Sequence, residues 1–347
     1  MDKASLSDFI CNLQKQHTVI APVRRRDLIL FDELGPSDTP TLEFANSKLP
    51  PKAFFFPRSE TLFRFSGKSG KMQLTPALAK SKPAVLMGVR PCDARSLVLL
   101  DKVFMTDKYT DTQYSRRRAN TTVVGMACTD PRTTCFCGSV GGDPFDVSGF
   151  DLLLMDIDHG YIMEALTQKG ERLLPHAPKT RSPTKEELRK QARIKSEARA
   201  AVERELPVEQ AETNLETMFE DDFWDRVAAK CLGCGVCTYL CPTCHCFDIT
   251  DDILDSNGAR VRSWDSCMYP LFTLQASGHN PRKSGKERMR QRVMHKFNYA
   301  VKNNDVAFCV GCGRCVQDCP VNLDIREVIK AVASQRRAAL QPKEAST

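Results

Sequence analysis

A cysteine pattern that occurs twice constrains this chain more than any other feature. In each copy the spacing is C-x2-C-x2-C-x3-C-P: first Cys231-Leu-Gly-Cys234-Gly-Val-Cys237-Thr-Tyr-Leu-Cys241-Pro242, then Cys309-Val-Gly-Cys312-Gly-Arg-Cys315-Val-Gln-Asp-Cys319-Pro320. In such a run three thiolates wrap around one iron–sulfur cube, and the fourth cysteine ligates the cluster of the other copy. The pattern therefore predicts two [4Fe–4S] clusters, one held by Cys231, Cys234, Cys237 and Cys319 and the other by Cys309, Cys312, Cys315 and Cys241.

The alternative for this pattern is a pair of structural zinc sites, which also use C-x2-C pairs. Two complete repeats with proline in the same register favour iron–sulfur clusters over zinc. A compact bacterial ferredoxin joins its motifs by a short hairpin, whereas 67 residues lie between Cys241 and Cys309 here. Because the flank 324–333 also has helical spacing, we expect a helical two-cluster ferredoxin-like domain over residues 222–347.

The total of 16 cysteines in 347 residues also bears on the compartment. A secreted disulfide framework of this density is normally a small domain, and residues 1–31 lack the basic start, apolar stretch and cleavage site of an export signal. No apolar run is long enough to cross a membrane. We therefore expect a cytoplasmic protein without membrane insertion, whose cysteines bind metal or carry out chemistry.

The first 160 residues read as mixed α/β. Short apolar runs at 84–89, 122–127 and 150–155 have the length of buried strands, a helix is expected over 95–103, and 53–56 and 61–65 look like two further strands. Cys92 and Cys128 each follow one of the buried runs, so both are expected at the carboxyl edge of one parallel sheet. Cys135 and Cys137 follow on a Gly/Pro-rich loop. These four thiols predict a third [4Fe–4S] cluster, with zinc or unmetallated thiols as the alternatives.

Three more cysteines stand outside these sets, namely Cys244, Cys246 and Cys267. With His245 they could form a further metal site. Alternatively, Cys244 and Cys246 pack against the neighbouring cluster or donate hydrogen bonds to its sulfides, which tunes a cluster's potential. The last cysteine, Cys11, lies in an apolar helix expected over 6–13 and is interpreted as a core residue.

The composition changes between the two cysteine-rich parts. From Thr184 to Lys230 the chain is rich in Lys, Glu, Arg and Ala with helical spacing, which predicts a helical connector. The expected division is an α/β cluster-binding domain over 1–183, a connector over 184–221 and the dicluster domain over 222–347.

Several signatures are missing from the sequence. No G-x-G-x-x-G follows a predicted strand, so we expect the chain to bind no dinucleotide itself. No Walker loop and no catalytic histidine pattern is found, so no residue is predicted to act as acid, base or nucleophile.

Basic residues are concentrated in two places. The segment 281–297 holds seven Lys/Arg and one Glu but few stacking aromatics, which argues against nucleic-acid binding. We expect these charges to face water or an acidic partner, and we expect the triplet Arg116-Arg117-Arg118 to lie on a solvated turn.

With these motifs noted, the chain resembles the β (iron–sulfur) subunits of cytosolic sulfhydrogenases, which are NADP-linked nickel–iron hydrogenases, and the related A subunits of anaerobic sulfite reductases. The resemblance spans nearly the whole length. It rests on the segments 50–56, 60–63, 88–93 and 262–267, on Gly278-His-Asn, and on the cysteines of all the sets above.

The resemblance implies a subunit of a cytoplasmic oxidoreductase complex that relays single electrons between a flavin/NAD(P)-binding subunit and a catalytic subunit such as a nickel–iron hydrogenase. An anaerobic sulfite reductase, or another reductase, is the alternative complex. A stand-alone iron–sulfur enzyme with substrate at the N-terminal cluster is the alternative class, and it would require an open iron site there.

Overall fold

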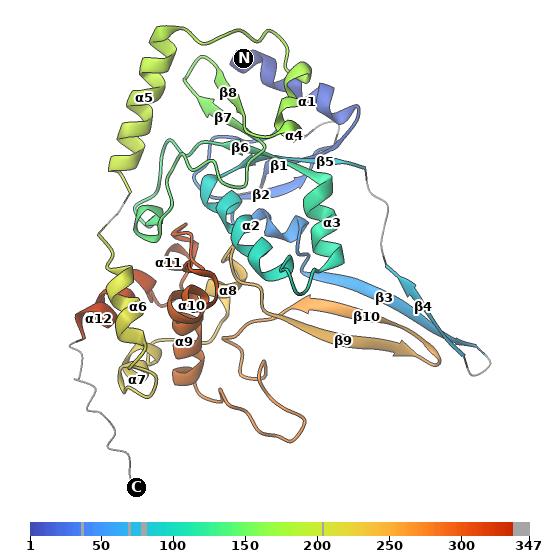
Figure 1. Ribbon diagram of the computed structural model, residues 1–347, viewed down its shortest axis with the longest axis vertical. Helices are drawn as coiled ribbons and strands as arrows, with labels where there is room; N and C mark the ends of the chain where they lie inside the picture. Colours follow the sequence, from blue (N-terminus) through green and yellow to red (C-terminus); the bar gives the residue numbers. More distant parts are fainter. Residues whose placement is uncertain (36–37, 69–70, 78–81, 203–204, 336–347) are drawn as a thin grey trace.

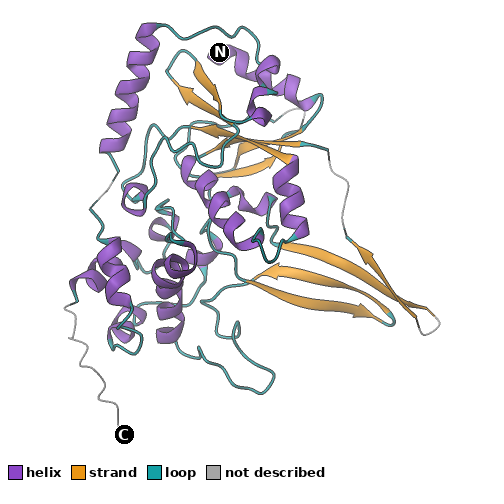
Figure 2. Ribbon diagram, in the orientation of Figure 1, coloured by secondary structure: helices purple, strands orange, loops and turns teal. Residues whose placement is uncertain are grey.

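The computed structural model describes residues 1–35, 38–68, 71–77, 82–202 and 205–335. Three parts are visible: a sheet flanked by helices, a group of helices that runs from α6 (Val208–Leu215) to α12 (Ile325–Ser334), and a narrow sheet that projects from between them (Figures 1 and 2). Among the described helices, none is long and apolar enough to cross a membrane.

The N-terminal part is built on a six-stranded sheet. Its strands run in the order β2 (Leu28–Glu33), β1 (Thr18–Arg25), β5 (Ala84–Val89), β6 (Thr121–Met126), β7 (Leu152–Asp156) and β8 (Tyr161–Ala165). The pairs β1–β5, β5–β6 and β6–β7 are parallel, whereas the two outer strands pair antiparallel. The four central strands are almost wholly buried, as expected of parallel strands covered on both faces.

Four helices pack against this sheet. They are α1 (Leu6–Gln14), α2 (Pro91–Phe104), α3 (Thr112–Asn120) and α4 (Gln168–Glu171). The mixed α/β character and the buried strands near 84–89, 122–127 and 150–155 are confirmed, and α2 includes the helix expected over 95–103. The strand expected over 53–56 is wrong, because that segment forms the short 3-10 helix Pro51–Phe54. A proline at the first position of a helix is preset for helical backbone, which explains the difference.

Cys11 is a further correction. Helix α1 buries Phe9, Ile10 and Leu13, and these residues occupy one face at helical spacing. Cys11 lies on another face and is exposed, so its interpretation as a core residue is wrong.

A second sheet joins distant segments of the chain. Its antiparallel order is β4 (Lys71–Pro76), β3 (Ser59–Lys68), β10 (Asn257–Trp264) and β9 (Phe247–Leu254). One hairpin thus comes from the N-terminal part and the other from the segment between the two ferredoxin motifs. The pairing of β3 with β10 ties the two halves together, and the sheet extends away from the body as an arm (Figure 2).

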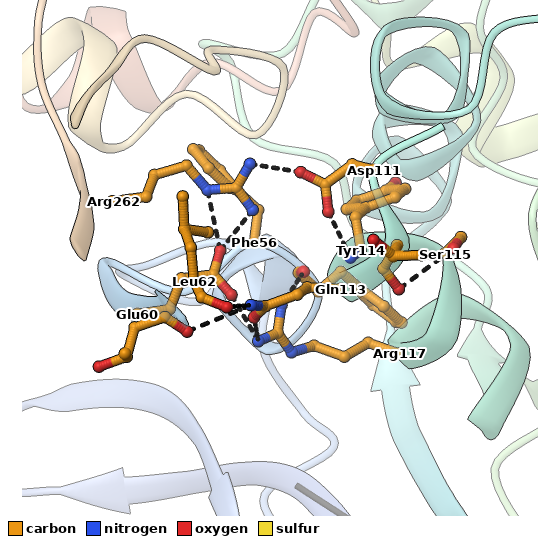
Figure 3. Close-up of polar contacts among 12 residues, drawn as sticks. Phe56, Glu60, Leu62, Asp111, Gln113, Tyr114, Ser115, Arg117 and Arg262 are labelled. Carbon is orange, nitrogen blue, oxygen red and sulfur yellow. Dashed lines mark hydrogen bonds and ion pairs between the residues drawn. The ribbon is translucent and has the colours of Figure 1, made fainter. Parts of the chain in front are cut away.

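Charged side chains fasten the base of this arm to α3 (Figure 3). The buried Glu60 carboxylate accepts hydrogen bonds from Arg262 Nε at 2.9 Å and Arg117 Nη2 at 2.5 Å. Arg262 also pairs with Asp111, whose carboxylate caps α3 by accepting from the backbone N–H of Tyr114 at 2.8 Å. The solvated turn expected at Arg116–Arg118 is therefore wrong, because these residues lie in a helix that presents Arg117 to Glu60.

The C-terminal part packs short helices around one apolar cluster that includes Leu215, Trp224, Phe297 and Ile329. Its elements are α6 (Val208–Leu215), α7 (Phe223–Ala228), α8 (Val236–Tyr239), α9 (Gly285–Met294), the π-helical segment His295–Tyr299, α10 (Ala300–Asn304), α11 (Arg314–Gln317) and α12 (Ile325–Ser334). In the expected connector the chain forms α5 (Lys185–Ala200) and then α6, which packs against α12; residues 203 and 204 lie outside the described part.

A buried ion pair holds the second ferredoxin loop on the N-terminal sheet. Arg314 Nη1 and Nη2 donate to the two carboxylate oxygens of Asp93 at 2.7 and 2.8 Å, and Arg314 Nε donates to the Ser47 carbonyl at 2.9 Å. Asp93 is 0% and Arg314 2% exposed. Since Asp93 follows Cys92 and Arg314 lies between Cys312 and Cys315, this pair fixes two cysteine-bearing segments against each other.

We predict that Arg314→Gln strongly destabilises the protein, because it leaves the Asp93 carboxylate buried without its partner. The expected loss is about 3–5 kcal/mol, the usual cost of breaking one side of a buried pair. Anaerobic thermal unfolding measures it, with Arg116→Gln as the control because Arg116 is exposed. Equal unfolding midpoints for the two variants would contradict the role given to the pair.

Candidate metal centres

Each ferredoxin motif forms a loop that ends in a single helical turn, α8 in the first copy and α11 in the second. The first three cysteines of the first motif and the last cysteine of the second come together. Cys231, Cys234, Cys237 and Cys319 line one cavity with Cys315, Met268, Met289 and Arg292. This arrangement brings together the four cysteines that the sequence assigns to one cluster.

The second set is gathered in the same way. Cys241, from the first motif, lies close enough to Cys309, Cys312 and Cys315 to contribute to raising the pKa of each thiol, although burial is the larger cause. Burial and these neighbours raise the pKa of Cys309 to about 11. Such thiols lose their protons when they ligate a metal.

The N-terminal cysteines converge at the carboxyl edge of the parallel sheet. Cys92 is at the start of α2, directly after β5, and Cys128 follows β6. Burial, together with other thiols of the set, raises the pKa of Cys135 to about 11 and that of Cys137 to about 12, and Cys128 acts on both. Cys92 is likewise within the electrostatic range of Cys128.

This N-terminal set lies directly against the second ferredoxin loop. The backbone N–H of Phe136 donates to the Gly311 carbonyl at 2.8 Å, and the Cys135 thiol lies 3.9 Å from the Cys312 carbonyl. Asn46 bridges the two as well, since its Nδ2 donates to the Cys312 carbonyl at 2.8 Å and its Oδ1 accepts from the Cys92 thiol at 3.8 Å. The two cysteine sets are therefore in direct contact.

Gly311 shows how tight this contact is. Its φ is +61°, and a Cβ at this position would lie 2.4 Å from the backbone nitrogen of Cys137. Only glycine provides both the left-handed backbone and the missing side chain.

Three cations are buried among the cysteines. Lys296 Nζ donates to the Cys241 thiol at 3.2 Å, and Lys52 Nζ donates to the carbonyls of Cys241 at 2.8 Å and Cys244 at 2.6 Å. Arg292 lines the first cavity, and its Nε is buried without a hydrogen-bond partner among the described residues. Burial works to lower the pKa of Arg292, but Cys237 and Cys315 outweigh it and raise that pKa.

These cations correct the interpretation of the basic segment 281–297. Arg290, Arg292 and Lys296 are buried, at 9%, 4% and 5% exposure, and only Arg290 pairs with a carboxylate, that of Glu220. The expectation that all seven charges face water or acid is therefore wrong. Arg292 and Lys296 face thiols instead. Buried cations without carboxylate partners are costly, and thiolates bound to iron would compensate them, so the cysteine sets fit iron–sulfur clusters.

The remaining cysteines also gather near this centre. Cys244 contributes to lowering the pKa of the Cys241 thiol, and Cys267 contributes to lowering the pKa of the Cys246 thiol. The His245 ring packs against His295 at a centroid distance of 5.4 Å. Within the described residues, no three His, Cys, Asp or Glu side chains converge closely enough to hold a single metal ion.

Comparison with known proteins agrees with this geometry. Residues 230–323 match the family model described as a 4Fe–4S dicluster domain. The chain is 34% identical to sulfhydrogenase 2 subunit beta of Pyrococcus furiosus over 328 residues, which cover 94% of this chain and 95% of the relative. This chain belongs to the sulfhydrogenase beta-subunit family. None of the solved structures matches it.

Family membership and the matched domain make this chain an iron–sulfur protein of the 4Fe–4S electron-transfer class, related to a hydrogenase subunit. Sequence reasoning missed Lys52, because nothing near Pro51 in the sequence indicates that the side chain reaches the first ferredoxin motif. The sequence identified Arg292 and Lys296 only as members of a basic segment, not as neighbours of the cysteines. Their spacing of four residues, which places both on one helix face, was the available signal.

We predict that Gly311→Ala disrupts the contact between the N-terminal cysteine loop and the second ferredoxin loop, because the new Cβ overlaps the Cys137 backbone. Iron and sulfide bound per chain should fall by about one cluster or more. Gly278→Ala is the matched control, since Gly278 has φ of +82° but no atom within 4 Å of its added Cβ. Equal iron content in both variants would contradict the close contact.

Proposed function

We propose that this chain is the electron-transfer subunit of a multisubunit oxidoreductase, with three [4Fe–4S] clusters along its length. The proposed ligands are Cys92, Cys128, Cys135 and Cys137 for the N-terminal cluster; Cys309, Cys312, Cys315 and Cys241 for the middle cluster; and Cys231, Cys234, Cys237 and Cys319 for the distal cluster. The clusters supply one-electron redox chemistry when bound.

One observation carries this proposal: the three cysteine sets are contiguous. The N-terminal loop contacts the second ferredoxin loop through Phe136 and Gly311. Cys319 of the second ferredoxin motif lines one cavity with Cys231 and Cys237 of the first, which supports the proposed exchange of fourth cysteines between the motifs. The protein residues hold the cysteine sets against one another and place buried cations beside them. Contiguous cysteine sets with buried cations among them suit a relay of electrons rather than a catalytic centre.

The relative from Pyrococcus furiosus is named as a subunit. This supports the proposal that the present chain also functions in a complex with partner subunits. We propose a flavin/NAD(P)-binding subunit at one end of the relay and a catalytic subunit, hydrogenase or reductase, at the other, in the cytoplasm. The domain division at residues 183 and 221 belongs to this proposal.

A pocket beside Cys128 favours the alternative of a stand-alone enzyme. It has a volume of about 360 Å³ and is lined by Glu43, Arg90, Cys128 and Asp130 among others. A substrate there would touch the N-terminal site, provided that one of its irons lacked a cysteine ligand.

Electron counting tests the relay. The protein is reduced anaerobically, freed of reductant and mixed with an oxidised one-electron dye. Three cubanes should deliver about three electrons per chain, one from each. Delivery of two electrons per chain would remove the N-terminal cluster from the proposal. Delivery of no electrons would indicate zinc sites or thiols without metal. Turnover of sulfite or another substrate by the chain alone would favour the enzyme.

We predict that Cys135→Ser lowers the iron content by about four per chain, from roughly 12, because one cubane loses a ligand. Iron and acid-labile sulfide assays measure the change. Cys11→Ser is the control, since Cys11 is exposed on α1. Unchanged iron in the Cys135 variant would show that this thiol is not a ligand.

We also predict that the isolated chain reduces neither NAD nor NADP, because no dinucleotide fingerprint follows any strand of the parallel sheet. Anaerobic absorbance of the nicotinamide after mixing with the pre-reduced chain measures this. Reduction without added flavoprotein would contradict the prediction, whereas reduction only when a flavoprotein is added agrees with it.

A further inference from the structure

Lys296 is a buried cation in contact with the proposed middle cysteine set. It lies in the π-helical segment His295–Tyr299 and is 5% exposed. Its Nζ donates to the Cys241 thiol at 3.2 Å, to Thr243 Oγ1 at 3.0 Å and to the Phe308 carbonyl at 3.0 Å. An ammonium has three donors. All three are therefore used, and they go to a thiol, a hydroxyl and a carbonyl rather than to a carboxylate.

The surrounding hydrogen bonds fix this ammonium between two segments that carry proposed ligands. The Phe308 N–H donates to the Lys296 carbonyl at 2.9 Å, so the main chain and the side chain of Lys296 both bond to Phe308. Thr243 is 1% exposed, and its hydroxyl donates to the same Phe308 carbonyl at 2.7 Å. Thr243 lies two residues after Cys241, and Phe308 directly precedes Cys309. Lys296 thus joins the two parts of the chain that contribute to the middle set.

A second buried ammonium adjoins the same set. Lys52 is 2% exposed, and its Nζ donates to the Cys241 carbonyl at 2.8 Å. Two positive charges therefore contact Cys241, the residue that the first ferredoxin motif is proposed to contribute to the middle cluster.

The cations of the other two sets are placed differently. Arg292 lines the cavity of the distal set, but its Nε has no hydrogen-bond partner among the described residues. Beside the N-terminal set, Arg90 donates to backbone carbonyls, and the charge of Arg314 is balanced by Asp93. Within the described part of the chain, Lys296 differs from these three arginines in donating to a cysteine thiol.

This difference bears on how readily each site accepts an electron. An added electron increases the negative charge of a cluster, so a fixed cation and an N–H···S hydrogen bond stabilise the reduced state more than the oxidised state. Net charge and hydrogen bonds to the sulfurs are among the factors that set the reduction potential of such clusters. Both effects are larger in the protein interior than in water, because the local dielectric is low. The middle set combines two cations with one such hydrogen bond.

We propose that Lys296 makes the middle cluster the most readily reduced site of the relay, so that the first electron taken up by the chain resides there. The inference rests on the proposed function, because it requires clusters at three sets. The step is the transfer of one electron from a one-electron reductant, such as a reduced viologen dye, which is itself oxidised. No bond forms or breaks, and Lys296 keeps its proton. Lys296 is a positioning residue that acts through Cys241 and does not carry the electron.

A redox titration of the full-length protein without oxygen, followed by electron paramagnetic resonance, tests this role. Lys296→Met removes the charge and the N–H donors but keeps a side chain of similar length. At the potential where half of the wild-type middle site is reduced, the ratio of reduced to oxidised site should fall about tenfold, because hydrogen bonds to charged groups are the stronger class. For a one-electron couple this is a shift of about 59 mV to lower potential. Lys296→Arg keeps the charge and the N–H donors and should restore most of the shift.

Lys302→Met is the matched control, since Lys302 is half exposed and pairs with Glu216 at 3.0 Å. Its titration should match that of the wild-type protein. A Lys296→Met protein with full iron content and the wild-type midpoint overturns the inference and leaves the relay in place. Wild-type protein without any cluster signal overturns the proposed function and this inference with it.

If Lys296→Met loses iron, the electron's position in otherwise intact protein decides. Protein grown with lysine that carries a magnetic nitrogen isotope is reduced by about one electron per chain. Its paramagnetic resonance signal should show coupling to the lysine nitrogen, and the coupling should weaken in Lys296→Arg, where the labelled nitrogen nearest to the thiol is gone. Absence of lysine coupling, or coupling seen only when arginine is labelled in the wild-type protein, overturns the inference.

Discussion

The buried pair of Asp93 and Arg314 is the interaction on which the arrangement of the cysteine sets depends. It joins the start of α2, where Cys92 lies, to the loop that carries Cys312 and Cys315. A buried pair of this kind tolerates little displacement, because its charges are stabilised only while the hydrogen-bond geometry is kept. The glycine at 311 then allows the Cys135–Cys137 loop to approach the ferredoxin backbone. In the proposed relay, electron transfer between sites depends on a fixed separation, and these two features would supply it.

Charge compensation is the second constraint. In the proposed arrangement, several thiolate-ligated clusters in one interior concentrate negative charge. Lys52, Arg292 and Lys296, none of which has a carboxylate partner among the described residues, would balance that charge. Counting charges along the sequence gave the wrong location for two of these cations, because it treated cysteines as neutral. Once cysteines are counted as metal-bound thiolates, a basic helix beside them is expected to be buried.

The sequence predicted the parts of this molecule that follow local rules. Buried strands of 5–6 residues are recognisable in the sequence as apolar runs. The placement of Cys92 and Cys128 at one edge of a parallel sheet was therefore predictable. The repeated motif, likewise, grouped the ferredoxin cysteines. Non-local pairings were not predictable: β3 and β10 lie about 200 residues apart, and no local signal in Ser59–Lys68 identifies its partner strand. The same holds for Lys52, whose role depends on a fold that brings Pro51–Phe54 against the first motif.

The most direct test of the central claim, that the cysteine sets form one continuous relay, is the electron paramagnetic resonance spectrum of the fully reduced wild-type protein. Reduced clusters that lie against one another couple magnetically, so neighbouring sites should give broadened, interacting signals that simplify when Cys135 is replaced by Ser. Well-resolved signals from isolated clusters, unchanged by that substitution, would contradict the account.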